Sequence, residues 1–193
     1  FVKLLNMSKF SLKKEKIRNR FLNLRLRLIN EKVNINSVLI TLTLKKMDTM
    51  VSAKSILLYM PIKNEVETKY IFSFLAEGKK TLFLPAFDKK TWLICKYKFG
   101  DDLVTGPFNT KQPRNIQPVH INDCDIALIP GLAFSNNGFR IGYGKGVYDR
   151  LLENSSCIKI GLCYDFQIVK RLNLEDGDIP MDIIVSEKRS ILI

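Results

Sequence analysis

Apolar positions near the start of the chain recur with the period of a helix. They follow one another at steps of four, three and four residues, at Ile17, Phe21, Leu24 and Leu28. This spacing predicts a helix with one apolar stripe. Ser11 is the expected N-cap, because a serine hydroxyl can accept a hydrogen bond from a free amide of the first turn.

The rest of the chain alternates short apolar runs with helical stretches. The apolar runs predict strands over residues 55–60, 81–87, 92–97, 125–131, 157–164, 183–185 and 191–193. Helices are predicted over residues 37–50, 68–76 and 147–154. The connection 106–118 contains three prolines and is expected to lie on the surface. Since no repeat or linker divides the chain, it predicts a single α/β domain over residues 1–193, with three layers and a mostly parallel central sheet flanked by helices.

A glycine-rich loop follows the predicted strand 125–131, at the carboxyl end where α/β sheets bind ligands. Four of the ten glycines fall within nine positions, at Gly138, Gly142, Gly144 and Gly146. The loop carries Arg140 and Lys145 and has no acidic residue before Asp149. Glycines let backbone amides approach an anion, the following helix would add its N-terminal amides, and the two cations balance the charge. The loop therefore predicts a phosphate site.

The loop does not match the common phosphate-binding motifs. A Walker A loop would need glycine in place of Phe139 and serine or threonine in place of Gly146. A Rossmann motif would need glycine in place of Val147. A tight strand-to-helix turn without a ligand is the structural alternative, but the paired cations and the missing acids favour phosphate.

The chain is basic, with 31 lysines and arginines against 19 acidic residues and a net charge of +12. Such a balance favours an anionic partner, which could be a nucleic acid, a membrane surface or a small polyanion. Lysines on solvated faces explain it as well, since only residues 13–27 are locally rich in cations. The apolar fraction of 46% is typical of a globular protein and argues against disorder.

Composition excludes several kinds of site. His120 is the single histidine, which rules out multi-histidine zinc sites and leaves any Ser–His–Asp triad dependent on this residue. Four cysteines without a CxxC pair are typical of a reduced protein, so a cytoplasmic location is expected. No run approaches the about 20 apolar residues of a membrane span. Residues 1–10 are expected to be disordered or an upstream extension, with Met7 as a candidate biological start.

Four motifs appear in order along nearly the whole chain. They are KEKIR at 14–18, EVET at 65–68, PGLAFSNNGFRIGYGKGVYDRLL at 130–152 and DIPMDIIVSE at 178–187. In these motifs the chain resembles the 5-formyltetrahydrofolate cyclo-ligases, also called 5,10-methenyltetrahydrofolate synthetases. It departs from the pattern of that family at Val147, where an aromatic residue is usual, at Ser135, where aspartate is usual, and at Gln112, where an acidic residue is usual.

The resemblance implies a ligase of one-carbon metabolism that uses ATP to close a ring on a reduced folate. ATP would phosphorylate the formyl oxygen of 5-formyltetrahydrofolate, N10 would attack the activated carbon, and phosphate would leave to give 5,10-methenyltetrahydrofolate. ATP and Mg²⁺ are the implied cofactors, and the folate and ATP are the implied partners. A monomer is implied, and no nucleic acid or membrane is expected as a partner.

The resemblance also implies roles for particular residues. The residues expected to bind ATP are Lys14, Arg18, Arg140, Ile141, Gly142, Tyr143, Gly144, Lys145, Gly146, Val147 and Tyr148. Those expected to bind the folate are Met60, Glu65, Tyr143, Gly144, Lys145, Gly146 and Val147. Lys145 and Arg140 are the predicted catalytic residues, because they would neutralise charge on the transferring phosphoryl group. Asp149 and Asp178 are the predicted magnesium ligands.

Each of these roles has an alternative. Lys14 and Arg18 could belong to a solvated helix face, Glu65 could cap the following helix, and Met60 could be part of the core. Asp149 could pair with Arg150 or cap the helix, and Asp178 could face solvent in an acidic turn. For the whole chain, the alternatives are a degenerate homologue that binds folate or nucleotide without turnover, and a basic nucleic-acid-binding protein.

Overall fold

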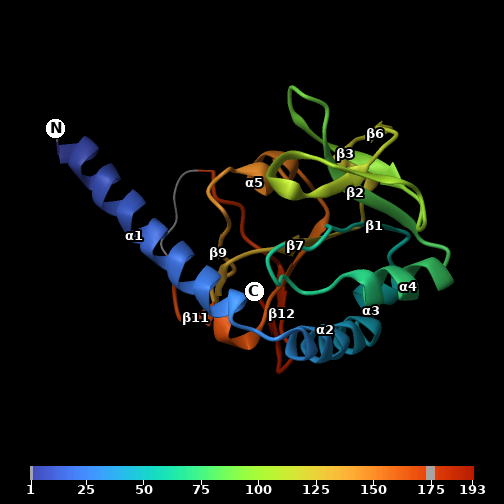
Figure 1. Cartoon of the computed structure of the whole chain (residues 1–193), viewed down its shortest axis with the longest axis horizontal. Helices are drawn as coiled ribbons and strands as arrows, with labels where there is room; N and C mark the ends of the chain where they lie inside the picture. Colours follow the sequence, from blue (N-terminus) through green and yellow to red (C-terminus); the bar gives the residue numbers. More distant parts are fainter. Residues whose placement is uncertain (1, 173–176) are drawn as a thin grey trace.

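The computed structural model describes residues 2–172 and 177–193, and it shows a central sheet with helices against both faces (Figure 1). The helices are α1 (Val2–Leu26), α2 (Asn30–Lys45), α3 (Asp48–Ser52), α4 (Lys69–Glu77) and α5 (Val147–Leu151). The strands are β1 (Ser55–Leu57), β2 (Thr81–Phe87), β3 (Trp92–Tyr97), β4 (Leu103–Thr105), β5 (Lys111–Pro113), β6 (Pro118–Val119), β7 (Ile126–Pro130), β8 (Ala133–Ser135), β9 (Arg140–Ile141), β10 (Ile158–Leu162), β11 (Ile168–Val169), β12 (Ile183–Val185) and β13 (Ser190–Leu192). Short 3₁₀ turns lie at Pro107–Asn109, Ile121–Asp123 and Asp165–Gln167.

The central sheet has the strand order β13-β12-β10-β7-β1-β2-β3-β6. The strands from β12 to β2 pair in parallel, whereas β13, β3 and β6 add to the edges in antiparallel pairs. The predicted α/β sheet is therefore confirmed, but it is parallel only at its centre. The physical reason is that short connections such as residues 88–91 between β2 and β3 reverse the chain, and they can join only antiparallel neighbours.

Successive residues of the central strands enter two different cores. In β1, Ile56 packs toward α2, α3 and α4, and Leu57 packs toward the opposite face, where α5 lies. The same alternation places Leu128 in the first core and Ile129 in the second. Both faces of the sheet are therefore buried, which explains why its strands appear in the sequence as continuous apolar runs.

The observed helices differ from the predicted ones at their ends. α1 begins at Val2, so Ser11 lies inside the helix and does not cap it, and residues 2–10 are helical. The predicted helix 37–50 is divided into α2 and α3, because Met47 adopts an extended conformation (φ −82°, ψ 122°) between them. The predicted helix 147–154 ends at Leu151. In contrast, α4 (Lys69–Glu77) differs from the predicted helix 68–76 by only one residue at each end.

A small second sheet attaches α1 to the rest of the protein. It has the order β11-β8-β9, and α1 packs on it through Phe21, beside Leu132 and Ile141. None of these short strands was predicted from the sequence. This packing places the basic face of α1 against the glycine-rich loop, which continues from β9.

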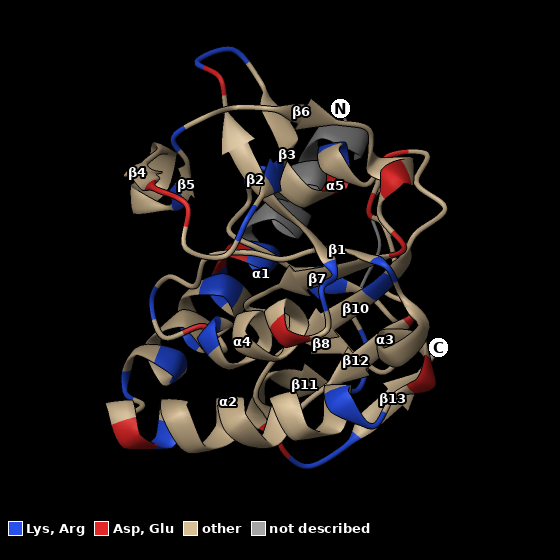
Figure 2. Cartoon of the chain, turned by 90° about the vertical axis from the view of Figure 1, so that its right-hand side faces the viewer, with Lys and Arg blue, Asp and Glu red and all other residues tan. Residues whose placement is uncertain are grey.

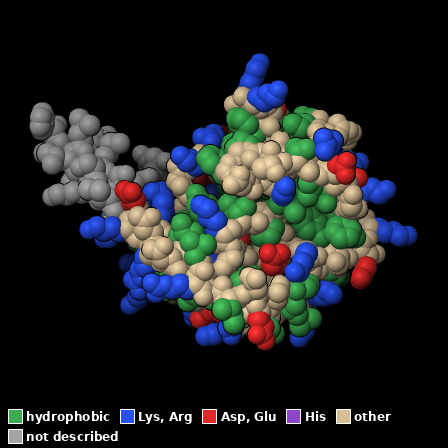
Figure 3. Space-filling view, viewed as in Figure 1, with side chains coloured by type: hydrophobic (Ala, Val, Ile, Leu, Met, Phe, Trp, Pro, Cys, Tyr) green, Lys and Arg blue, Asp and Glu red, His purple; other side chains and the backbone are tan. Residues whose placement is uncertain are grey.

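Charged side chains are distributed over the surface. Figure 2 shows lysine and arginine on helices, strands and loops alike. The space-filling view shows basic side chains spread over the visible face, with acidic ones among them (Figure 3). This distribution favours the interpretation that most of the positive charge lies on solvated faces. Within the described ranges, no helix is both long enough and apolar enough to cross a membrane.

We expect Gly161→Ala to destabilise the fold by about 1–3 kcal/mol, because overpacking a tight core strains its neighbours. A Cβ atom on Gly161 would overlap the ring of Phe134, which is fully buried, and would lie 3.2 Å from Cγ of Met181. Gly78→Ala is the control, since a Cβ there meets nothing closer than 3.5 Å. Urea unfolding of both variants measures the difference, and equal midpoints would contradict the prediction.

Candidate active site

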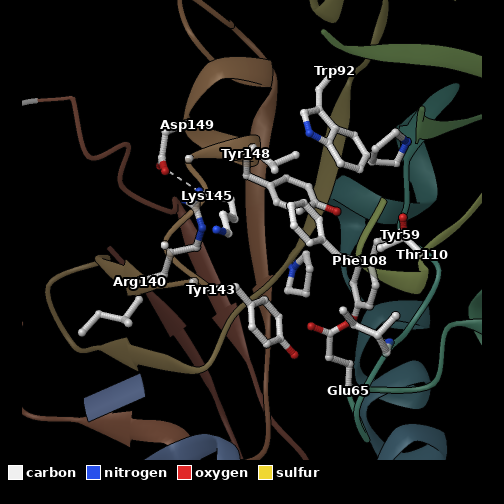
Figure 4. A pocket seen from close by; sticks show the side chains of 18 of the residues that line it. Tyr59, Glu65, Trp92, Phe108, Thr110, Arg140, Tyr143, Lys145, Tyr148 and Asp149 are labelled. Carbon is white, nitrogen blue, oxygen red and sulfur yellow. Dashed lines mark hydrogen bonds and ion pairs between the residues drawn. The ribbon is translucent and has the colours of Figure 1, made fainter. Parts of the chain in front are cut away.

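A cavity of about 350 Å³ lies where α1, the segment after β1 and the glycine-rich loop meet (Figure 4). It opens beyond the carboxyl ends of β1 and β7, as expected for a sheet with a parallel centre. The cavity brings together every residue that the sequence analysis assigned to ATP, folate or metal: Lys14, Arg18, Met60, Glu65, Arg140, Ile141, Gly142, Tyr143, Gly144, Lys145, Gly146, Val147, Tyr148, Asp149 and Asp178.

Two cations of α1 face this cavity from one side of the helix. Lys14 is 8% exposed, and its Nζ lies 3.0 Å from Oδ2 of Asp178. One turn later, the Nε of Arg18 donates to the carbonyl of Gly142 at 3.1 Å. Since Phe21 anchors the same side of the helix, both cations are held toward the loop. The alternative of a solvated face applies to Lys13, Lys16 and Arg20 rather than to these two.

The loop between β9 and α5 bends sharply at its glycines. Gly144 and Gly146 have φ angles of +83° and +60°, which favour glycine. A Cβ atom on Gly144 would also lie 3.1 Å from Cζ of Arg18, so the loop approaches the arginine closely only because this side chain is absent. The helix that follows is a single short turn, Val147–Leu151. The predicted anion site therefore depends on the loop amides and cations, and the expected contribution of the helix is small.

The two predicted metal ligands each lie beside a cation. Asp149 Oδ1 accepts from a guanidinium nitrogen of Arg140 at 2.8 Å, and its side chain is 34% exposed. The alternative pairing with Arg150 is wrong, because Arg150 donates to the carbonyl of Lys145. Asp178 faces the cavity and Lys14 rather than bulk solvent. Among the described residues, no three His, Cys, Asp or Glu side chains cluster closely enough to hold a metal by themselves.

A buried arginine that the sequence analysis missed contacts three residues that line the cavity, which are Lys63, Glu65 and Tyr143; we call these three the floor of the cavity. Arg25 is 1% exposed and donates at 2.9 Å to the carbonyls of Lys63 and Gly131. It also donates to the hydroxyl of Tyr143 and lies 3.6 Å from Oε1 of Glu65. The sequence contained one indication of this role, because Arg25 follows Arg18 by seven residues and therefore lies on the same face of α1. Without the fold, however, a row of basic residues on one helix face is typical of a solvated surface.

Glu65 is buried beside this arginine, with 4% of its surface exposed. Its Oε2 accepts from the amide of Ile62 at 3.0 Å, and α4 begins after Thr68, so the alternative role as a helix cap is wrong. Burial raises the pKa of Glu65 from its ordinary 4.5 to about 7, and the charge of Arg25 opposes this rise without cancelling it. Glu65 therefore changes charge near neutral pH.

Tyr148 is a second buried titratable group at the cavity. Burial raises the pKa of Tyr148, so that its hydroxyl remains neutral.

Aromatic side chains form the other end of the cavity. Trp92 from β3 stacks on Phe108, with ring centroids 6.5 Å apart and planes 10° apart. Figure 4 shows these rings on the far side from Arg140 and Asp149, with Tyr148 between the two groups. Lys145 reaches toward them, since its Nζ lies 5.8 Å from the centroid of Phe108. The cavity is thus cationic at one end and aromatic at the other. The sequence analysis did not place either ring at the site.

The arrangement can be compared with known proteins. The model of the 5-formyltetrahydrofolate cyclo-ligase family matches residues 11–187. The chain belongs to this family. The 5-formyltetrahydrofolate cyclo-ligase of Haemophilus influenzae is 36% identical to it over 142 residues, which cover 69% of this chain and 76% of the relative. The corresponding protein of Mycoplasma genitalium is also 36% identical, over 71% of this chain and 74% of its own length.

Solved structures of similar proteins also support membership of this family. The NMR structure of Aquifex aeolicus 5,10-methenyltetrahydrofolate synthetase superimposes with a TM-score of 0.84 at 32% identity, covering 93% of this chain and 92% of that one. A synthetase from Mycoplasma pneumoniae superimposes with a TM-score of 0.73 at 25% identity. The predicted fold class and the prediction of an enzyme of the cyclo-ligase family are therefore confirmed.

Two of the three departures from the cyclo-ligase pattern lie away from the cavity. Ser135 is buried and its hydroxyl bonds to Asn137, so it shapes the turn before the loop. Gln112 is buried too, and its side-chain amide bonds to both the N–H and the carbonyl of Phe87, at 3.1 Å each. Only Val147 lines the cavity. Val147 is therefore the one departure of the three that a substrate in the cavity would contact.

Proposed function

We propose that this member of the family converts 5-formyltetrahydrofolate to 5,10-methenyltetrahydrofolate, with ATP and Mg²⁺ as its requirements and ADP and phosphate as by-products. Family membership supports the conversion. The observation that carries the finer proposal is the single cavity with a cationic, glycine-lined end and an aromatic end with a buried carboxylate. A triphosphate suits the first end and a pterin suits the second.

The proposed reaction needs little covalent chemistry from the protein. The formyl oxygen attacks the γ-phosphorus of ATP, and the bond to the leaving ADP breaks. The N10 nitrogen then adds to the activated carbon, and the C–O bond breaks as phosphate departs with both bonding electrons. The N10–H proton is lost, which leaves the methenyl bridge. Catalysis of this kind depends on holding reactants together and on neutralising phosphate charge.

At the cationic end, Lys145 and Arg140 have the proposed catalytic role. Lys145 extends from the glycine turn into the cavity, and among the described residues it forms no ion pair. Arg140 is held by Asp149 and by the carbonyl of Ile179 at 3.3 Å. Lys14 and Arg18 approach the same loop from α1 and would hold the remaining phosphates.

At the other end, Glu65 and Met60 are the proposed folate contacts. Both residues line the cavity, next to Tyr59, and Met60 also packs against the first core. A carboxylate accepts hydrogen bonds from the N–H groups of a pterin, and the surrounding apolar side chains exclude water from this pair. Tyr143 and the loop residues 144–147 lie between the two ends, where they can contact both substrates.

Asp149 and Asp178 fit a magnesium ion that is bound together with ATP. Both are hard oxygen donors on the wall of the cavity, and one or two carboxylates suffice when phosphates and water complete the shell. The ion would neutralise charge on the β- and γ-phosphates. The cations beside them, Lys14 and Arg140, would share the same phosphates.

The direct test follows methenyltetrahydrofolate by its absorbance, with purified protein, 5-formyltetrahydrofolate, ATP and Mg²⁺. We expect product only when all are present, and none after exhaustive chelation. Binding of both substrates without product would favour the degenerate homologue. Filter binding to RNA with a steep salt dependence would favour the nucleic-acid alternative.

The four cysteines support a reducing compartment, and we propose the cytoplasm. All are buried free thiols. Burial raises the pKa of Cys124 to about 12, so it carries no thiolate at neutral pH and reacts slowly.

We expect kcat/KM for the folate to fall about tenfold per pH unit below pH 7, because the pKa of Glu65 is about 7 and only its carboxylate accepts from the pterin. The Glu65→Gln variant should have a lower kcat/KM than the parent at pH 8, and this kcat/KM should not change with pH between about 5.5 and 8.

The raised pKa also means that the stability contributed by Glu65 is complete below pH 4.5 and is lost as the pH rises through about 7. Urea unfolding should show this loss only in the parent protein, and a parallel rate profile in the variant would contradict the assignment.

We expect Asp149→Asn and Asp178→Asn each to raise the Mg²⁺ concentration needed for half-maximal rate by about tenfold, because the amide removes the charge that attracts the ion. Folate binding without nucleotide should stay nearly unchanged. Asp102→Asn is the matched control, since its side chain is 83% exposed and does not line the cavity. A magnesium titration separates the variants, and an unchanged midpoint for Asp178→Asn would remove that residue from the metal site.

A further inference from the structure

The side chain of Gln112 in β5 extends the central sheet at the end of β2. Residues 84–87 of β2 lie beyond the last residue that pairs with β1. There the Oε1 of Gln112 accepts from the N–H of Phe87, and its Nε2 donates to the carbonyl of Phe87, at 3.1 Å each. These are the two bonds that a residue of an antiparallel strand would exchange with Phe87. One side-chain amide thus takes the place of a strand residue.

These bonds connect a separate hairpin to the sheet. Strands β4 and β5 form a two-stranded sheet of their own, and we call residues 103–113 the β4–β5 hairpin. Its tip is the turn Pro107–Asn109. Gln112 is 6% exposed and does not line the cavity, whereas Phe108 at the tip does. Gln112 therefore influences a bound substrate through the residues that the hairpin carries.

The tip of the hairpin has a backbone that must be held in place. Phe108 and Asn109 have φ angles of +60° and +58°, in the left-handed region that favours glycine. Residues other than glycine keep this conformation when surrounding contacts fix it. One such contact is the stack of Phe108 on Trp92, and Trp92 lies directly opposite Phe87 in the β2–β3 pair. The residue that Gln112 binds is therefore the cross-strand neighbour of the ring on which Phe108 stacks.

We propose that Gln112 is a positioning residue for the folate, because its two bonds to Phe87 hold Phe108 against Trp92 at the aromatic end of the cavity. The identity of the substrate in this inference rests on the proposed function, whereas the placement of the ring does not. The departure from the family pattern matters at this position. An ionised carboxylate could accept from the N–H of Phe87 but could not donate to its carbonyl, so glutamine gives this chain the second bond.

Tryptophan fluorescence of the substrate-free protein tests the placement of the ring. Trp92 is the only tryptophan of the chain, so its emission reports on the stack with Phe108. Gln112→Met keeps the length of the side chain and removes the amide. We expect this variant to emit at a longer wavelength and to be quenched more strongly by acrylamide, because water reaches a ring that has lost its cover. Gln117→Met is the matched control, since Gln117 is exposed and does not line the cavity, and its emission should match that of the parent.

A double-mutant cycle shows whether Gln112 acts through Phe108. Gln112→Met should raise KM for 5-formyltetrahydrofolate by about threefold to tenfold, the scale of one aromatic contact, with kcat close to that of the parent. Gln112→Glu keeps one of the two bonds and should give a smaller increase. In a Phe108→Ala background, Gln112→Met should raise KM no further, because the ring that it positions is absent. A general structural role would instead give increases in KM that add in the double variant.

Gly106→Ala tests the same link without a change at Gln112. A Cβ atom on Gly106 would overlap the side-chain amide of Gln112, so this variant should show the same shift in emission and the same increase in KM. Gly78→Ala is the control, because a Cβ there meets nothing closer than 3.5 Å. Far-ultraviolet circular dichroism verifies that each variant is folded.

Two results would overturn the proposal. One is parent-like emission of Trp92 in both Gln112→Met and Gly106→Ala, and the other is an additive effect of Gln112→Met and Phe108→Ala on KM. In a protein that forms no methenyltetrahydrofolate, a shift in emission still supports the placement of the ring and an unchanged emission still contradicts it. The failure of this inference is therefore distinguishable from the failure of the proposed function.

Discussion

Lys145→Ala is expected to lower kcat/KM by about two to three orders of magnitude, the usual effect of removing one preorganised contact to a transition state. Lys145 lies between two glycines of the loop and points into the cavity from an exposed turn. Its ammonium group is held within 5.8 Å of the Phe108 ring centroid, so it is partly positioned before ATP binds. Its charge would oppose the charge that develops on the transferring phosphoryl group.

The fold should be unaffected, because Lys145 belongs to no core cluster. Thermal unfolding of Lys145→Ala should therefore match the parent within about 0.5 kcal/mol. Lys90→Ala is the matched control, since Lys90 is an exposed lysine in the turn between β2 and β3 and does not line the cavity. Steady-state measurements of kcat/KM test the prediction. If Lys145→Ala has the same kcat/KM as the control, the phosphate site has been assigned to the wrong cation.

Arg25→Met is expected to reduce the free energy of unfolding by about 3–5 kcal/mol, the usual result of removing one partner from a buried ion pair. The change would leave the carbonyl of Lys63 and the hydroxyl of Tyr143 without this donor and the Glu65 carboxyl without its cation, whereas the carbonyl of Gly131 keeps its bond from Gln167. It would also raise KM for the folate, because Glu65 and Tyr143 are both positioned by this guanidinium. Urea unfolding and KM are measured on the same preparation.

The neighbouring Arg27→Met is the control, since Arg27 is exposed on the turn after α1 and should change stability by less than about 0.5 kcal/mol. The double variant Arg25→Met with Glu65→Gln should recover part of the lost stability, because the buried carboxyl that lost its cation is then neutral. It should not recover folate affinity, which depends on the carboxylate. If Arg25→Met unfolds at the same urea concentration as the control, the arginine does not hold the floor of the cavity.

The sequence predicted some strands to the residue and missed others. β2, β3 and β12 were predicted with their observed bounds, because each apolar run ends at a polar residue, which is Asp88, Lys98 or Ser186. The strands β4, β5, β6, β8, β9 and β11 were missed, since each has only two or three residues and none contains three apolar residues in succession, as β12 does. Their pairing depends on contacts such as Phe134 with Ile168, which are far apart in the chain.

The candidate site was also predicted in part. The composition of the loop around Gly144 indicated an anion site, and the motifs indicated the family. The sequence did not predict which side chains pair with one another, since Asp149 pairs with Arg140 and not with its neighbour Arg150. The aromatic end was missed as well, because nothing in the spacing of Trp92 and Phe108 shows that they stack.

The sequence by itself therefore determined the order of the longer helices and of most central strands, the glycine-rich loop and the family, because periodicity, turn chemistry and motif spacing act over a few neighbouring residues. Only the tertiary structure decided that Arg25 is buried against Glu65, forty residues further along the chain, and that Ser37 and Thr41 of α2 are buried beside its apolar residues. The physical reason is that burying a charge or a hydroxyl is favourable only when distant segments supply its partners. Those partners, the carbonyls of Lys63 and Gly131 for Arg25, exist in position only once the sheet has formed.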